Sequence, residues 1–271
     1  LYSEFYKPAK EGTLNPYRKF IQALAKDNPF ISKHYIENLH KLDEISKQRL
    51  LFGNWEYDDD PSKLLEYDDI MDLFTNTPEE NKEKYISCDV ARFGNDRTVI
   101  VVWEGFVAKK WIILPKSSIT EVVTQLEQFC VTENVRRSNV VVDEDGVGGG
   151  VVDVFEGCKG FINNSSAIQP PEEEKKVNYA NLKTQCAFEF ARMAKQGKVR
   201  IEGLTVEDKE MLVQELEQLK QKDIDSDGKI ALVPKDQIKE NIGRSPDLLD
   251  AVVMRFYFEV QPTVNFFFAT F

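Results

Sequence analysis

The chain has 271 residues, of which 42% are hydrophobic and 11% aromatic, so it can bury a substantial core and is not a disordered tail. Its net charge of −11 argues against a protein that coats nucleic acid through bulk electrostatics, because neutralising phosphates requires Lys and Arg on the contact face. Contact with DNA through a local basic surface stays open, since bound cations would cancel part of the carboxylate charge.

The sequence shows no targeting or membrane-spanning pattern. No run of about 18 apolar residues occurs, and the first residues, LYSEFYKPAKEG, lack the basic-then-apolar pattern of a signal peptide. We therefore expect an intracellular protein with no membrane partner. Because the chain starts at Leu1, inside a polar segment, we also expect it to be a fragment of a longer protein.

The cysteines and histidines do not form a recognisable metal-binding pattern. No CxxC pair occurs, and the two histidines, His34 and His40, are far from every cysteine in the sequence, so no zinc site is expected. Disulfides are not expected in an intracellular chain, because thiols stay reduced there. The cysteines are most simply small apolar residues of the core. They are Cys88, Cys130, Cys158 and Cys186.

Residues 1 to about 80 are rich in polar and aromatic residues. They contain one plausible helix, 32–51, which we expect to stop at Gly53, with Trp55 anchoring the connection that follows. We interpret this region as a linker or lid and not as part of a sheet.

From Lys84 the pattern changes to strands rich in Val, Ile and aromatic residues. The segments 84–91, 97–105 and 106–114 predict three consecutive strands and hence an antiparallel start. A helix over 118–134 and a short apolar strand, NVVVD, follow. The glycine-rich stretch GVGGG then opens a second helical run, VVDVFEG, which gives a β-α-β-α rhythm.

The last third of the chain alternates helices with short strands. We predict an amphipathic helix over 179–197, closed by Gly197, then a strand VRIEG, a helix over 206–222, a DSDG turn and a strand KIALVP. A final helix begins near Ser245 as N-cap, with Pro246 at the first helical position. The predicted fold class is α/β, a mixed sheet of three antiparallel strands plus parallel strands with helices on both faces, which fits the ribonuclease H-like architecture.

Two aspartates are associated with predicted strands. Asp89 lies in the middle of the first strand, among core residues, where a carboxylate must be paired or bind a cation. Alone, it is equally well explained as the start of a turn. Asp143 ends a later strand, at the edge where the sites of open α/β sheets collect. A nucleotide-binding loop is the rival explanation there, but Val151 stands where the third glycine of GxGxxG is needed, and the acids before the glycines would repel a pyrophosphate.

Two more aspartates begin the final helix. Asp247 and Asp250 are three residues apart and so project from one face. The favourable interaction of an acid with a helix N-terminus explains Asp247 well. Asp250 is deeper in the helix and is flanked by apolar residues, so capping does not explain it.

Together the aspartates form an ordered set along the predicted elements. Two cations about 3.5 to 4 Å apart, one activating water and the other stabilising the leaving oxygen, are clamped by carboxylates of this kind in phosphodiester hydrolysis. Because no His or Cys ligand is available, the set indicates Mg²⁺ or Mn²⁺.

Three segments of the chain resemble the acidic motifs of the nuclease domain of the phage large terminase subunit, the DNA-packaging motor. They are DVARFGND, VVVDEDGVGGGVVD and GRSPDLLDAVVMR, and IENLHKLDEISKQRLLFGNWE is similar to the linker that precedes that domain. The resemblance covers the chain from about residue 35. It implies a linker segment over 1–80, after an ATPase domain that is missing here, and a ribonuclease H-like nuclease domain over 81–271.

The resemblance also implies a function and site residues. Asp89, Asp143 and Asp250 would be catalytic metal ligands, and Asp247 a supporting ligand, with Asp145 or Glu144 as a fallback for Asp143. The activity would be two-metal-ion, Mg²⁺- or Mn²⁺-dependent cutting of concatemeric double-stranded viral DNA during genome packaging. Portal protein and the small terminase subunit would be partners, in the cytoplasm of the infected bacterial host. GxxxxGK[ST] does not occur in this sequence, so ATP hydrolysis is assigned to the missing upstream part.

Other signals admit two explanations each. The segment 223–234 matches the first half of a calcium loop, but Pro234 stands where the bidentate Glu is needed, so a plain hairpin turn is the preferred interpretation. Several basic residues flank the acidic motifs and line either a DNA path or a solvated surface. They are Arg92, Arg97, Lys235, Lys239 and Arg244. Alternatives to the nuclease are a noncatalytic ribonuclease H-like docking module and a Holliday-junction resolvase, which shares the acidic layout.

Overall fold

The computed structural model describes residues 5–32, 35–36, 51–53, 60–91, 96–170, 178–223 and 228–262. The chain divides into two compact units, Leu1–Asp60 and Pro61–Phe271. The first unit contains α1 (Lys7–Lys10) and η2 (Ala25–Asp27), and none of its described residues is buried. Most of the predicted helix over 32–51, together with Trp55, Arg92 and the apolar tail 265–271, lies outside the described residues.

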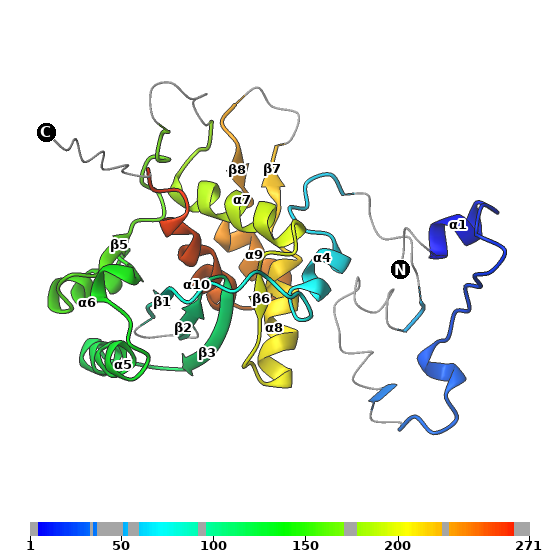
Figure 1. Ribbon diagram of the computed structural model, residues 1–271, viewed down its shortest axis with the longest axis horizontal. Helices are drawn as coiled ribbons and strands as arrows, with labels where there is room; N and C mark the ends of the chain where they lie inside the picture. The colour runs from blue at the N-terminus through cyan, green and yellow to red at the C-terminus, as the bar shows by residue number, and fades with distance from the viewer. Residues whose placement is uncertain are drawn as a thin grey trace, which may run out of the picture. The chain divides into compact units, whose positions relative to one another are not determined.

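The second unit is built on a six-stranded mixed sheet with the strand order β5-β4-β1-β2-β3-β6 (Figure 1). The first three strands pair antiparallel: β1 (Lys84–Asp89), β2 (Thr98–Glu104) and β3 (Val107–Leu114). Three further strands each run parallel to a neighbour: β4 (Val140–Asp143) beside β1, β5 (Lys159–Phe161) beside β4, and β6 (Arg200–Ile201) beside β3. The predicted mixed sheet is therefore confirmed.

Helices cover both faces of this sheet (Figure 1). One face is covered by α5 (Ile119–Thr132) and α6 (Gly148–Val154), and the other by α7 (Leu182–Lys195) and α10 (Asp247–Arg255). Because successive side chains of a strand point to opposite faces, β2 serves both cores. Ile100 and Val102 pack beneath α5 and α6, whereas Val99, Val101 and Trp103 pack with α7 and α10.

The remaining described elements complete the second unit. These are α4 (Tyr67–Asp72), η3 (Arg137–Asn139), α8 (Val206–Leu216), α9 (Lys235–Ile242), η4 (Phe256–Phe258) and an antiparallel pair, β7 (Gln221–Lys222) with β8 (Ala231–Leu232). Leu64, Leu65, Ile70 and Leu73 pack in the same core as α7, so the end of the predicted linker segment 1–80 belongs to the second compact unit. Among the described residues, no helix is long and apolar enough to cross a membrane.

Some element boundaries predicted from the sequence are wrong. Asp89 is the last residue of β1, not its middle. The helix predicted over 206–222 ends at Leu216, and its last residues form β7 because they pair with β8. The sequence did not predict β5 or α9: β5 has three residues, and α9 has eight residues and buries only Ile238, so both elements are short and contain few apolar residues.

Candidate functional site

Asp89 and Asp143 lie side by side at the carboxyl ends of two parallel strands. The register of β1 and β4 pairs Cys88 with Val142, and the next residue on each strand is the aspartate. Asp89 is only 5% exposed, and Asp143 is half-buried. A hydrogen bond links the two carboxyl groups and opposes the rise in the pKa of Asp143 that burial causes. The structure thus brings together two acids that are far apart in the sequence.

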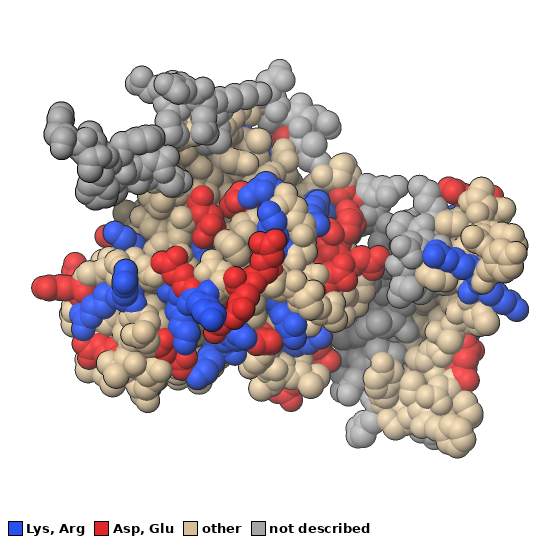
Figure 2. Space-filling view, viewed as in Figure 1, with Lys and Arg blue, Asp and Glu red and all other residues tan. Residues whose placement is uncertain are grey.

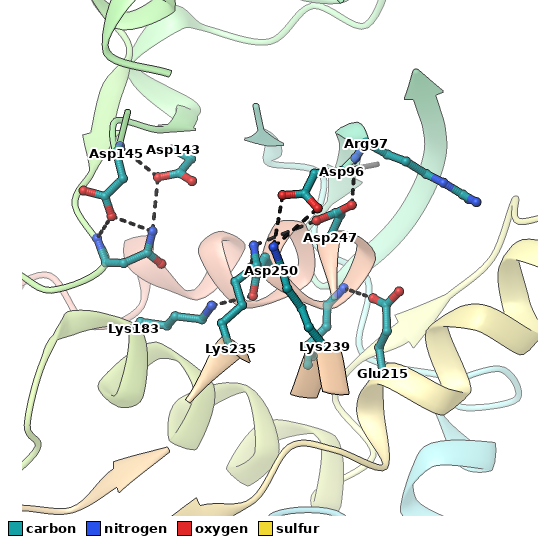
Figure 3. A network of polar contacts seen from close by, with 12 residues as sticks. Asp96, Arg97, Asp143, Asp145, Lys183, Glu215, Lys235, Lys239, Asp247 and Asp250 are labelled. Atoms are coloured by element: carbon teal, nitrogen blue, oxygen red, sulfur yellow. Dashed lines mark hydrogen bonds and ion pairs between the residues drawn. The ribbon is translucent and has the colours of Figure 1, made fainter. Parts of the chain in front are cut away.

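The first turns of α10 place two further carboxylates at this edge of the sheet (Figure 3). Asp247 and Asp250 are 5% and 7% exposed. The Oδ2 atom of Asp247 accepts a hydrogen bond of 2.7 Å from the backbone N–H of Arg97, just before β2, which fixes the start of α10 against the sheet. Asp250 is close enough to Asp89 for its negative charge to raise the pKa of Asp89. All the aspartates predicted as site residues therefore lie in one cluster.

Two lysines bind the oxygens of Asp250 (Figure 3). Lys183 Nζ from α7 lies 2.6 Å from Oδ1, and Lys235 Nζ from α9 lies 2.8 Å from Oδ2 and 3.9 Å from Asp247 Oδ1. From the sequence, Lys235 was assigned either to a DNA path or to a solvated surface. In the structure its ammonium group instead pairs with the carboxylates of Asp250 and Asp247. Lys239, from the next turn of α9, pairs with Asp96 at 3.3 Å.

The pKa shifts in the cluster reflect burial together with the proximity of several carboxylates. Burial, and then the charge of Asp250, raises the pKa of Asp89 well above its usual range. Burial likewise raises the pKa values of Asp143 and Asp247. For Asp250, burial also acts upward, but the ammonium groups of Lys183 and Lys235 outweigh it, and the pKa is lowered. Part of the cluster thus favours protonation where no cation is near, which is the electrostatic setting expected of a cation site.

An asparagine holds Asp143 from the far side of β4. The side-chain Nδ2 of Asn163 donates to Asp143 Oδ1 at 3.2 Å and to Asp145 Oδ2 at 2.8 Å. The Asp145 N–H also donates to Asp143 Oδ1, at 3.0 Å. Both donors orient the Asp143 carboxylate. Asn163 follows the short strand β5, and nothing in the local sequence marks it.

The glycines after Asp143 allow a close approach of two backbone segments. A Cβ atom at Gly148 would lie 1.6 Å from the carbonyl oxygen of Asp143, so only glycine fits at the start of α6. A Cβ atom at Gly160, in β5, would lie 1.7 Å from Glu144 Oε2. The GVGGG stretch is therefore explained by packing around the end of β4, as a strand-to-helix turn.

The N-terminus of α10 is capped by a glutamate from another helix. The sequence predicted Ser245 as the N-cap, and this prediction is wrong. Pro246 occupies the N-cap position and supplies no side-chain acceptor. Glu215 of α8, which is 2% exposed, accepts a 2.9 Å hydrogen bond from the backbone N–H of Leu249 instead. Burial raises the pKa of Glu215 to about 8. The sequence gave no local signal for this contact, because Glu215 lies on the amphipathic helix α8.

A cavity of about 410 Å³ opens beside Asp250. Asp145, Asn163, Lys183 and Lys235 line its polar side, and residues of β8, α9 and α10 line its apolar side. The end of the segment that resembles half a calcium loop, residues 231–234, also lines the cavity. Residues 224–227 of that segment are outside the described part, and the strand predicted after them is β8.

Comparison with known proteins identifies the fold. No protein-family profile matches the chain, and no curated protein matches its sequence. Among solved structures, the nuclease domain of the large terminase subunit gp2 of bacterial virus Sf6 gives a TM-score of 0.60 at 18% identity. A mutant of that domain with manganese and beta-thujaplicinol gives 0.62 at 16%, and a mutant with calcium gives 0.60 at 17%. Each match covers 72% of this chain and 98% of the other. The predicted resemblance is thereby confirmed at the level of the fold, and the chain has the ribonuclease H-like fold of phage large-terminase nuclease domains.

Proposed function

We propose that this chain is a metal-dependent endonuclease domain that cuts concatemeric double-stranded viral DNA during genome packaging. The observation that carries this proposal is the convergence of Asp89, Asp143, Asp247 and Asp250 from β1, β4 and α10 at one edge of the sheet. A fold shared with terminase nuclease domains supports the same function.

The chemistry of the donor set fits hard divalent cations. We assign Asp89, Asp143 and Asp250 as catalytic metal ligands and Asp247 as a supporting ligand. All of them offer carboxylate oxygens, which Mg²⁺ and Mn²⁺ prefer. When bound, two such ions would supply an activated water and charge stabilisation of the leaving oxygen. Relatives of this fold have been solved with manganese and with calcium, which supports a divalent-cation site here.

The lysines on Asp250 determine what must change when a cation binds. Among the described residues, no three His, Cys, Asp or Glu side chains are arranged as ligands around one point. The ammonium groups of Lys183 and Lys235 contact one oxygen each of Asp250, so a cation must displace them to reach that carboxylate. Asn163 meanwhile holds Asp143 in place, and Glu215 and Asp247 hold the start of α10.

The biological setting follows from the same assignment. We propose that the domain acts on double-stranded DNA in the cytoplasm of an infected bacterium, within a motor that also contains a portal protein and a small terminase subunit. ATP hydrolysis would belong to another part of that motor.

Cleavage of supercoiled plasmid in Mn²⁺, Mg²⁺ or EDTA tests the proposal. We expect nicking that requires the metal and falls by on the order of 10³-fold or more in Asp89→Ala and Asp250→Ala, as expected when a group that acts in the transition state is removed. The matched control is Asp153→Ala, an exposed aspartate on α6. Circular dichroism establishes that each variant is folded.

Three results would point elsewhere. Nicking that survives both substitutions would refute the assignment of the ligands. The absence of cleavage under every condition would favour the noncatalytic docking module. Strong preference for four-way junctions over linear duplex would favour a resolvase.

A further inference from the structure

Arg97 connects the candidate metal site to the adjacent surface. Its backbone N–H is bonded to Asp247, so its Cα position is fixed beside a proposed ligand. Its side chain runs away from the carboxylates (Figure 3). There its Nη1 contacts the sulfur of Met211 at 3.4 Å, and a thioether is only a weak acceptor. In the described part of the chain, no carboxylate lies within ion-pair distance of the Arg97 guanidinium group.

A second guanidinium group, that of Arg244, also contacts Met211. Arg244 Nη2 donates to the carbonyl oxygen of Met211 and Nη1 to Gln214 Oε1, both at 2.9 Å. Burial lowers the pKa of Arg244, the charge of Glu215 opposes this, and the positive charge of Arg97 adds to the lowering. Arg244 has a carboxylate partner, because its Nε lies 3.5 Å from Glu215 Oε1. Of these two arginines, only Arg97 therefore lacks a carboxylate partner among the described residues.

The net negative charge of the chain makes a cation without a carboxylate partner significant. On the face drawn in Figure 2, Lys and Arg side chains alternate with Asp and Glu and do not form one basic field. With a net charge of −11, the chain needs local cations wherever it contacts a polyanion. Guanidinium groups suit this role because their planar donors match phosphate oxygens.

We propose that Arg97 binds a phosphate in the backbone of the DNA strand that lies on the carboxylate cluster. The inference rests on the proposed function, since it takes the polyanion to be the DNA that the aspartates cut. Phosphates repeat along a strand, so a strand with one phosphate at the carboxylates presents others to the neighbouring surface. Contacts of this kind position the duplex without reading its sequence. Arg97 is thus a DNA-positioning residue.

The test is binding of a fluorescent duplex to the full chain in EDTA, measured by anisotropy over a series of salt concentrations. Cleavage is absent in EDTA, so binding is measured independently of catalysis. We expect Arg97→Gln to bind more weakly at low salt and to reduce the slope of log K against log salt by about 0.9, the value for one lost phosphate contact. Arg97→Lys should retain the slope but bind more weakly than wild type, because an ammonium group lacks the planar fork. Arg192→Gln, which removes a charge from α7 that is paired with Glu189, is the matched control.

Each outcome decides the proposal. An Arg97→Gln curve that superimposes on wild type, an equal loss in Arg192→Gln, or no measurable duplex binding by wild type would overturn it. Inorganic phosphate, added at concentrations too low to screen charge, should weaken duplex binding by wild type more than by Arg97→Gln, because the site recognises a phosphate group. Failure of the nuclease proposal is seen separately, as weakened binding in Arg97→Gln together with no metal-dependent nicking by wild type.

Discussion

The two ends of α10 both bury charge, but in different ways. At the C-terminal end, Arg255 is fully buried and its charge is matched: Nη2 donates to Gly105 O at 2.9 Å, Nη1 pairs with Glu259 at 2.8 Å, and the guanidinium group lies 3.7 Å from the Tyr85 ring centroid. At the N-terminal end, several carboxylates share two ammonium groups beside an open cavity. Charge is buried at both ends, whereas an excess of negative charge is found only at the N-terminal end of α10.

The difference indicates which buried charges serve stability and which serve function. When a buried ion pair loses one partner, the remaining charge is buried without compensation, and the free energy of unfolding falls. A group of like charges that the protein does not neutralise costs stability unless a ligand supplies the opposite charge. The candidate site is therefore expected to lower the stability of the metal-free protein, and the Arg255 end to raise it.

The largest effect is expected at Arg255. Arg255→Met should lower the free energy of unfolding by about 3 kcal/mol, because it leaves Glu259 and the Gly105 carbonyl without their donor and removes the cation from its aromatic neighbours. Urea denaturation followed by circular dichroism measures the change. Arg192→Met, at an exposed position, should change stability by less than about 0.5 kcal/mol. Equal effects of the two substitutions would remove the distinction drawn between the ends of α10.

A smaller effect of opposite sign is expected at Asp89. Asp89→Asn should stabilise the protein in EDTA, because burial and the charge of Asp250 disfavour the ionised carboxylate. The pKa of Asp89 is raised in the folded state, so its contribution to stability is lost as pH rises through that value, and the gain is best measured at mildly alkaline pH.

Thermal unfolding in EDTA and isothermal titration with Mn²⁺ check this prediction together. The same variant that melts at a higher temperature should bind Mn²⁺ more weakly, as in other sites where function opposes stability. Asp153→Asn on α6 should change neither quantity. A lower melting temperature for Asp89→Asn in EDTA would contradict the proposed charge excess.

A dependence of stability on pH is expected at Glu215. Its pKa is raised to about 8 in the folded state from its usual value of 4.5, so its stabilising contribution is present below about 4.5 and is lost as pH rises through about 8. Wild type should lose stability over this window with a slope that Glu215→Gln lacks, at most about 1.4 kcal/mol per pH unit. Glutamine keeps an oxygen that can accept from the Leu249 N–H. Parallel profiles for the two proteins, measured by urea denaturation between those pH values, would contradict the prediction.

Much of the sheet was predictable from the sequence because strands and helices leave local patterns. Val- and Ile-rich runs identified β1, β2, β3 and β4, and amphipathic periodicity identified α5 and α7. The positions of Asp89, Asp143 and Asp250 within or beside those elements were visible too. The short strand β5 and the short, weakly apolar helix α9 were not, because so few apolar residues do not distinguish a short element from a loop.

The sequence by itself determined the elements, their order and the aspartates at their ends. Only the tertiary structure decided which side chains meet them: Lys183 reaches Asp250 across 67 residues, and the Arg97 N–H reaches Asp247 across 150. Local patterns depend on neighbours a few residues away, whereas these contacts arise when α7, α9 and α10 pack on the sheet. That packing also paired Lys235 with a carboxylate, assigned the α10 cap to Glu215, and left the guanidinium group of Arg97 without a carboxylate partner among the described residues.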